Sequence, residues 1–136
     1  MFKIEGDVLL IEFDGLNTNI VKSDSDLIFK GNNVKSILNY SCICYGSSLN
    51  GRIRGSKWAL KSKYKLPIVI SEKEKLLFFP VNEMWINFAM IEDVKRKNDG
   101  VEVLFKNGLK REFNVSYTIF NNQVLKSSRL WIIFLS

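Results

Sequence analysis

The order of apolar and polar residues along the chain predicts a protein built mainly of β-strands. Val8 to Ile11 form an apolar run with polar ends inside residues 7–13, and residues 26–30 have a second short strand pattern. Further strand-like segments are residues 58–64, 67–71, 76–79 and 84–94. A charged turn at residues 71–75, Pro80 and the polar residues 95–98 are expected to separate or end them.

Two segments have the three- and four-residue spacing of a helix instead. Apolar residues recur at that spacing from Val34 to Tyr45, where Gly46 is expected to end a short helix. Cys42 lies on the apolar face of this helix and is predicted to be a core residue. Ser116 is expected to cap a C-terminal helix. The core side of that helix is predicted to carry Tyr117, Phe120, Val124 and Trp131.

Residues 101–115 predict a β-hairpin whose register follows from its polarity. A two-residue turn at Asn107-Gly108 would mix polar and apolar side chains on both faces of the hairpin. A three-residue loop, 106–108, places Gly108 in a left-handed bulge and gives one apolar face. That face consists of Val101, Val103, Phe105, Leu109 and Phe113.

These elements predict a single α+β domain over residues 1–136. An antiparallel sheet accounts for most of the chain, with a short internal helix and a C-terminal helix. A chain of 136 residues with 46% hydrophobic residues is long and apolar enough to form a core without disulfides.

Residues 46–57 are expected to form an irregular loop. Three glycines and three serines lie in these twelve residues, which disfavours a regular element. Gly46 and Gly51 have the spacing of a phosphate-binding loop, but Arg52 and Ile53 follow where Lys and Ser or Thr are required. A nucleotide site is therefore not expected here.

The positive charge of the chain lies in one window. The net charge is +6, and residues 30–65 contribute +8 because they contain no acidic residue. The residues before the window contribute −4 and those after it +2. Such a window predicts a polyanionic partner: nucleic acid first, and an anionic membrane second. Residues 52–65 lack the continuous apolar face of a membrane-surface helix, which disfavours the membrane.

The residue types present exclude several classes of enzyme. Without histidine, the chain cannot form a Ser-His-Asp triad, an HExxH zinc site or a Cys₂His₂ site. Asp93-Val94-Lys95 has the form found in metal-dependent nucleases, but no second carboxylate is identifiable by spacing, and a solvated turn is the favoured interpretation. We therefore predict a protein that is not an enzyme, with no cofactor, no metal and no small-molecule substrate.

The cysteines and the apolar runs predict a soluble cytoplasmic protein. Cys42 and Cys44 are too close in sequence for a structural disulfide, which indicates a reducing compartment. The longest apolar run, Leu130 to Leu135, is far shorter than the ~20 residues that span a bilayer. The N-terminal residues do not have the pattern of a signal peptide.

The basic window supplies the candidate DNA contacts. Glycines flank Arg52 and Arg54, so the two arginines can approach the narrow, electronegative minor groove. The predicted DNA-binding residues are Ser47, Ser48, Asn50, Gly51, Arg52, Arg54, Lys57, Lys61, Lys63 and Lys65. The predicted secondary contacts to the DNA backbone are Lys95, Arg96, Lys97, Lys110 and Arg111, whose charge is diluted by nearby acids.

Two sequence patterns are the most specific in the chain: Cys-x-x-x-Gly-Ser-Ser-x-x-Gly-Arg from Cys42 and Ser-Tyr-x-x-Phe-x-Asn-Gln from Ser116. Shorter characteristic segments are Phe79-Pro80, Trp85-Ile86 and Phe105 with Asn107-Gly108. In these motifs, over about residues 26–130, the sequence resembles the competence transcription factor ComK family of low-GC Gram-positive bacteria.

The resemblance implies a regulator of competence genes that binds double-stranded DNA at A/T-rich boxes, largely through the minor groove. It also implies dimers that assemble into tetramers on promoters, and control by an adaptor that delivers the factor to a Clp protease. Members of the family usually continue into a tail motif resembling Phe-Met-Leu-Tyr-Pro, which is absent before Ser136. The alternative is therefore a truncated paralogue that modulates a full-length relative through protein contacts.

The apolar residues at the C-terminal end predict a further interface. Residues 130–135 are all apolar, and one helix face can bury only about half of them. We expect the final helix to form or flank a homodimer interface that includes Trp131 and Phe134. The alternative is that this run packs into the core of its own chain.

Overall fold

The computed structural model describes every residue from Met1 to Ser136 and contains two antiparallel sheets and three α-helices. The six-stranded sheet has the order β3-β2-β1-β6-β5-β4, and the three-stranded sheet has the order β7-β8-β9. The elements in chain order are β1 (Val8–Phe13), β2 (Asn17–Lys22), β3 (Asp26–Lys30), α1 (Val34–Cys44), α2 (Leu49–Leu60), β4 (Ile68–Ser71), β5 (Leu76–Val81), β6 (Met84–Asn87), the 3₁₀ turn η1 (Phe88–Met90), β7 (Ile91–Lys97), β8 (Gly100–Phe105), β9 (Lys110–Phe113) and α3 (Tyr117–Phe134). The predicted α+β class is confirmed.

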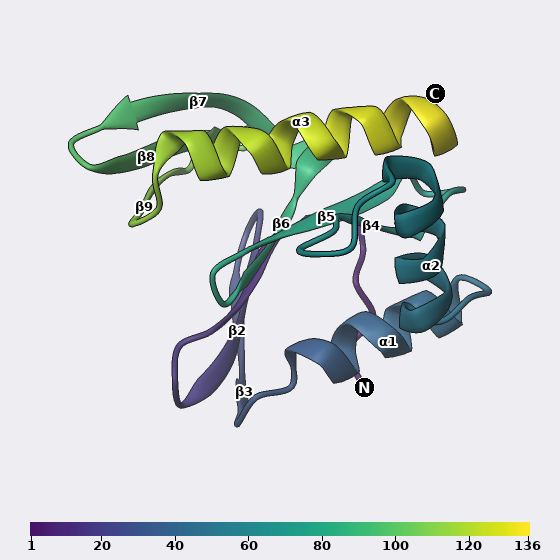
Figure 1. The fold of residues 1–136 in the computed structure, drawn as a ribbon. Coiled ribbons are helices and arrows are strands. Elements are labelled where there is room, and N and C mark those ends of the chain that lie inside the picture. Colours follow the sequence, from purple (N-terminus) through teal and green to yellow (C-terminus); the bar gives the residue numbers. More distant parts are fainter.

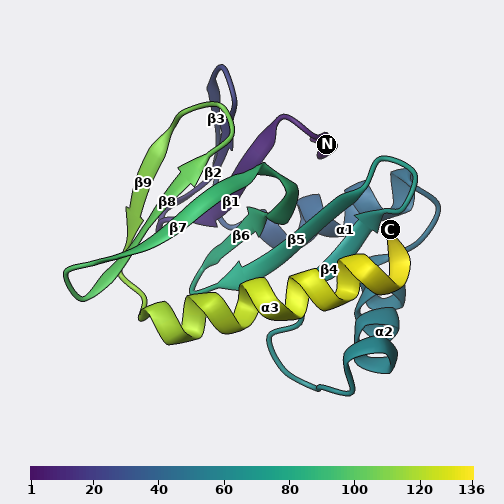
Figure 2. The same cartoon turned by 90° about the horizontal axis from the view of Figure 1, so that it is seen from above.

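The helix α3 lies across both sheets, while α1 and α2 pack beside β4 (Figures 1 and 2). Phe120 of α3 is fully buried between the sheets, edge-on to Phe79 of β5 at 5.6 Å and stacked on Phe113 of β9 at 6.2 Å between ring centroids. A second apolar cluster lies between the larger sheet and α1, and a third joins the ends of α2 and α3 to β4 and β5. None of the helices is both long enough and apolar enough to cross a membrane.

The hairpin has the predicted three-residue loop. The Phe105 amide donates to the Leu109 carbonyl at 2.8 Å, Gly108 has φ +91°, and Val101 pairs with Phe113. Val103 and Phe105 are buried on the same face, as expected. The prediction was wrong for Leu109, which is 39% exposed because it lies at the open end of the loop, beyond the reach of the core.

The glycine-rich segment is a helix, so the predictions of a loop at residues 46–57 and a strand at 58–64 were wrong. Ser48 caps α2: its hydroxyl accepts the Gly51 amide at 3.0 Å. Each glycine inside a helix costs about 1 kcal/mol relative to alanine. Burial of Leu49, Ser56 and Leu60 along one side of α2 offsets that cost.

The sequence pattern also missed where the sheets divide. The predicted single segment 84–94 contains β6, a 3₁₀ turn and β7, so the chain leaves the first sheet at Asn87 and starts the second. Pro80 lies inside β5 and does not end it. Its carbonyl accepts a hydrogen bond from Gln123 of α3, and the strand continues to Val81.

The two predicted helices begin where expected, and the buried face of α3 overlaps the predicted one but is shifted around the helix toward Gln123 and Ser127. Ser116 caps α3 through the Ile119 amide at 3.2 Å. The buried residues of α3 are Phe120, Gln123, Ser127 and Leu130. Of the predicted core residues other than Phe120, all three are half-buried: Tyr117, Val124 and Trp131.

Both cysteines are free thiols, and they differ in exposure to solvent. Cys42 is fully buried, as predicted, and burial raises the pKa of its thiol to about 11, whereas Cys44 is exposed. At pH 8 only about one Cys42 thiol in a thousand is ionised, and the thiolate is the reactive form. We expect a maleimide to label one thiol per folded chain quickly and the second only in denaturant. Cys44→Ser should abolish the fast reaction; if it survives, the placement of the two thiols is wrong.

Candidate nucleic-acid interface

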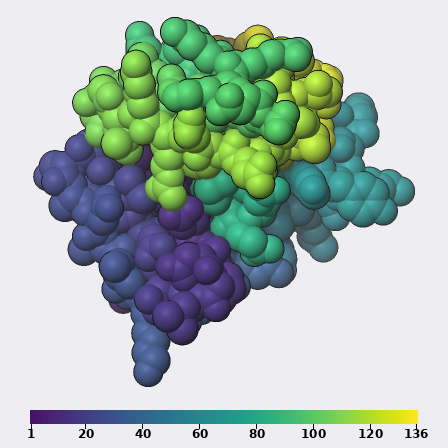
Figure 3. Space-filling view, turned by 90° about the vertical axis from the view of Figure 1, so that its left-hand side faces the viewer, coloured from purple at the N-terminus to yellow at the C-terminus, as the bar shows by residue number.

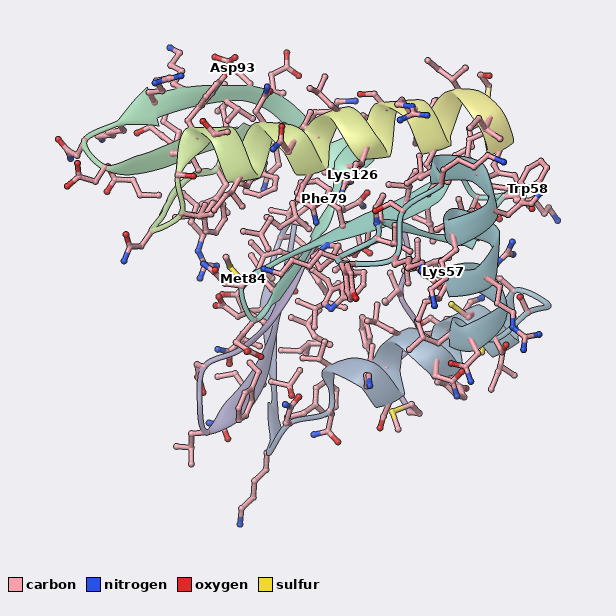
Figure 4. All side chains as sticks on the ribbon, viewed as in Figure 1. Lys57, Trp58, Phe79, Met84, Asp93 and Lys126 are labelled. Atoms are coloured by element: carbon pink, nitrogen blue, oxygen red, sulfur yellow. The ribbon has the colours of Figure 1, made fainter.

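One face of α2 is basic and open to solvent. Asn50, Arg54, Lys57, Trp58 and Lys61 follow one another at helical spacings and are all exposed, Trp58 by 69%. The residues on the opposite side of α2 are buried against β4 and its neighbours. Figure 4 shows Trp58 projecting away from the body of the molecule. The result is a row of cations with an aromatic side chain among them and no acid on the same helix.

The predicted residues at the start of α2 form its cap. Ser48 accepts the Gly51 amide, and the Leu49 amide donates to Asn39 Oδ1 at 3.0 Å. A Cβ at Gly51 would lie 3.0 Å from Ser47 Oγ and 3.2 Å from Ser48 Oγ, so this turn is closely packed. Ser48 is therefore engaged within the chain, and the free groups of the basic face begin at Asn50.

Arg52 faces inward, unlike Arg54. Its Nη1 lies 3.2 Å from Glu72 Oε1, and its side chain is only 17% exposed. Arg54 is exposed and forms no ion pair. The structure therefore separates the two arginines: Arg52 holds α2 to the β4–β5 turn, and Arg54 lies on the basic face.

The basic face continues into the connection between α2 and β4. Lys61 ends α2 in the left-handed conformation at φ 55°, and Lys65 is also left-handed at φ 47°. Lys63 is exposed, and Tyr64 is 79% exposed. We refer to residues 61–65 as the basic segment. With the exposed residues of α2, it forms one continuous candidate surface.

The chain fixes this segment from two sides. Gln123, which is buried in α3, donates through Nε2 to the Lys65 carbonyl at 2.9 Å and to the Pro80 carbonyl at 2.6 Å. Ser56 of α2 donates to the Pro67 carbonyl at 2.6 Å. The basic segment is therefore held against the sheet, although it has no regular secondary structure.

Replacing Gln123 by leucine should loosen the basic segment. The variant removes both donors and leaves two carbonyls without them, so we expect the free energy of unfolding to fall by about 1–3 kcal/mol. Urea unfolding measures the loss, and amide exchange should rise in residues 61–66. Asn122→Leu, at the exposed neighbouring position, is the control and should change neither. Equal effects of the two substitutions would contradict the anchoring role.

The predicted secondary contacts lie on the three-stranded sheet, and several are neutralised there. Lys97 contacts Glu112 at 2.8 Å and Glu102 at 3.0 Å, and these hydrogen bonds raise its pKa to about 12. Arg111 pairs with Glu12 of β1 at 2.6 Å, which joins the two sheets.

The remaining three secondary residues are more open. Arg96 lies 4.5 Å from the ring centroid of Tyr117, and Lys95 lies 3.9 Å from Asp93. Lys110 is exposed and forms no ion pair. This sheet and α2 lie at opposite ends of the molecule in both ribbon views (Figures 1 and 2), so the fold does not bring the two basic groups together.

The C-terminal apolar run packs partly into its own chain. Leu130 and Leu135 are buried in the third cluster. Trp131 packs on Phe88 with 5.8 Å between ring centroids, and Phe134 packs on Trp58 at 6.4 Å. The exposed members of the run are Ile132 at 67% and Ile133 at 46%. The dimer role of Trp131 and Phe134 stays a prediction.

Sequence reasoning missed the two exposed aromatic residues of this surface. The predicted strand 58–64 does not place Trp58 and Tyr64 on the same exposed surface as Arg54. Trp58 stands four residues after Arg54 and three before Lys61, and that spacing was the signal available in the sequence.

Comparison with known proteins adds the evolutionary context. The family model described as ComK protein matches residues 9–135. The chain is 30% identical over 131 residues to the competence transcription factor of Bacillus subtilis (strain 168), which covers 90% of this chain and 68% of the relative. No solved structure matches the chain.

Proposed function

Because this chain belongs to the ComK protein family, we propose that it is a transcriptional regulator of competence that binds DNA through the basic face of α2 and the basic segment. The observation that carries the proposal is the row of exposed cations from Arg54 to Lys65 in a window without a carboxylate. Such a surface neutralises phosphates and releases their counterions, which provides affinity for any DNA.

The helical conformation of α2 restricts how the groove is read. An α-helix with its side chains is about 10–12 Å wide, whereas the minor groove is about 6 Å wide. If A/T-rich boxes are read from the minor groove, as the family resemblance implies, the basic segment enters the groove and α2 lies along the adjacent phosphates. Lys63 and Lys65 are then the groove contacts, and Arg54, Lys57 and Lys61 contact the backbone.

The other members of the proposed DNA-binding set have supporting roles. Asn50 lies on the exposed face and is proposed to contact phosphate. Ser47, Ser48 and Gly51 form the turn that starts α2, and Arg52 holds α2 in place through Glu72. Lys95, Arg96, Lys97, Lys110 and Arg111 remain proposed secondary contacts, with Lys110 the most available.

A salt-titrated binding measurement tests the proposal. Affinity for an A/T-box duplex and for a G/C duplex of equal length should be measured between about 50 and 200 mM salt. If about six phosphates are neutralised, log K falls against log salt with a slope near −5 on both duplexes. A minor-groove-binding small molecule should displace the protein from the A/T duplex. Absence of binding at 50 mM salt would reject the proposed DNA-binding function. Binding that the small molecule does not displace would reject only the proposal that the minor groove is read.

A further inference from the structure

The two sheets have four edge strands, and three of them are protected. In the six-stranded sheet, α2 and α1 pack against β4. In the three-stranded sheet, the edges are β7 and β9, which carry mainly charged residues, and β9 has only four residues. Charge, short length and covering elements are the usual means by which proteins prevent an edge from pairing with another chain. The remaining edge, β3, has a different composition.

The centre of β3 is apolar and open. Its sequence is Asp-Leu-Ile-Phe-Lys, without proline, and its pairing with β2 has no bulge. Ile28 is 68% exposed and Leu27 is 37% exposed. Figure 3 shows this side of the molecule, where the purple and indigo atoms of the first strands lie at the surface below the green hairpin.

The backbone of β3 directs its free groups outward at alternate residues. At the two ends of the β2–β3 pairing, the Gly31 amide donates to the Leu16 carbonyl and the Lys22 amide donates to the Ser25 carbonyl. Residues 25 and 31 are therefore hydrogen-bonded positions, and such positions alternate along an antiparallel pair. By this alternation, Leu27 and Phe29 also direct their amides and carbonyls to β2. Asp26, Ile28 and Lys30 therefore direct theirs to the open edge.

We propose that β3 is the edge at which a second copy of this chain binds, as an antiparallel strand pair with its two-fold axis at Ile28. Ile28 then exchanges both backbone hydrogen bonds with Ile28 of the second copy. Asp26 lies opposite Lys30 of the second copy, and Leu27 lies opposite Phe29. The two six-stranded sheets become one continuous sheet of twelve strands.

Charge complementarity selects this occupant and this register. The carboxylate of Asp26 and the ammonium of Lys30 form no ion pair within the chain, so both are available. In the proposed pair, the two-fold axis produces two Asp26–Lys30 ion pairs between the copies. Shifting the register of the pair by two residues would place Asp26 or Lys30 opposite Ile28 of the second copy. A parallel pair in register would place Asp26 beside Asp26 and Lys30 beside Lys30. The β3 sequence is thus complementary to its own antiparallel copy.

The neighbouring contacts leave this pairing open. Asn33 Nδ2 donates to the Lys30 carbonyl at 2.8 Å, and a carbonyl oxygen can accept a second hydrogen bond. The Leu27–Phe29 pairs extend the apolar face of the second cluster, between the larger sheet and α1, against which Phe29 already packs.

A charge exchange tests the interface without DNA. Sedimentation at low salt should show a concentration-dependent dimer for the unchanged chain. Asp26→Lys and Lys30→Asp each convert two attractive pairs into two repulsive ones and should weaken the dimer roughly ten- to a hundred-fold. The double variant, and an equimolar mixture of the two single variants, should each dimerise again, because both restore opposite charges.

Two sets of measurements distinguish loss of the β3 interface from loss of the fold. Both residues are exposed, so circular dichroism and urea unfolding of the single variants should match the parent. A parent chain that stays monomeric at high concentration would overturn the proposal. So would single variants that dimerise like the parent. Loss of the dimer in Ile132→Ser, with no effect at β3, would place the interface on α3 instead. None of these outcomes depends on whether the chain binds DNA.

Discussion

Replacing Arg54, Lys57 and Lys61 together by alanine is expected to weaken DNA binding roughly a hundred-fold or more at about 0.1 M salt. The three side chains lie on one exposed face of α2 and form no ion pair within the chain, so their removal deletes phosphate contacts without disturbing the fold. Each lost phosphate contact lowers the slope of log K against log salt by about one, so the slope should fall by about 3. Fluorescence anisotropy with a labelled duplex measures both quantities.

A matched variant separates local contact from overall charge. Lys35, Lys73 and Lys106 are also exposed, and they lie on α1, the β4–β5 turn and the hairpin loop. Their replacement by alanine removes the same three charges and should change affinity only a few-fold through the general field of the protein. If the two triple variants lose affinity equally, α2 is not the interface.

Replacing Phe120 by alanine is expected to lower the free energy of unfolding by about 3–5 kcal/mol. The ring is fully buried and contacts Phe79 of one sheet and Phe113 of the other, so its loss leaves a cavity between the two sheets. Native domains are stable by about 5–15 kcal/mol, so this is a large share of the total. Thermal unfolding should shift down by roughly 10–20 °C.

The neighbouring residue provides the control for this substitution. Ile119 precedes Phe120 in α3 and is 52% exposed. Ile119→Ala should change the free energy of unfolding by no more than about 0.5 kcal/mol. Similar losses in the two variants would show that Phe120 does not hold the sheets together.

The local sequence pattern correctly predicted those parts of the fold that depend on contacts between residues close in sequence. The hairpin register followed from one apolar face and one glycine, and Gly108 does occupy the left-handed position. The caps at Ser116 and Gly46 likewise depend on adjacent residues. These features could be predicted because no distant residue decides them.

The parts that failed depend on distant contacts. The helix α2 contains two glycines, and burial against β4 and α3 stabilises it, which no local propensity reports. The division into two sheets depends on buried Asn87. Its side chain donates to the Val8 carbonyl at 2.9 Å and accepts the Ala89 amide at 3.2 Å, which turns the chain out of the first sheet.

In the candidate site, too, some features follow from the local sequence and others depend on distant contacts. The acid-free window identified the basic surface from the sequence alone. Which cations are free was not predictable, because the partner of Arg52 is Glu72, 20 residues further along and outside the window. Trp58 lies on the basic face because residues 49–60 form a helix, which the predicted loop and strand did not anticipate.

The two hydrogen bonds of Gln123 make α3 and the basic segment energetically coupled. A ligand that orders residues 61–65 also strengthens the contact between α3 and the Lys65 carbonyl. Coupling between two binding sites is reciprocal, so a partner that displaces α3 from β5 is expected to lower the affinity for a ligand at the basic segment, and that ligand should lower the affinity for the partner by the same factor. A partner that binds α3 could therefore change the affinity of the basic segment for its ligand without contacting that segment.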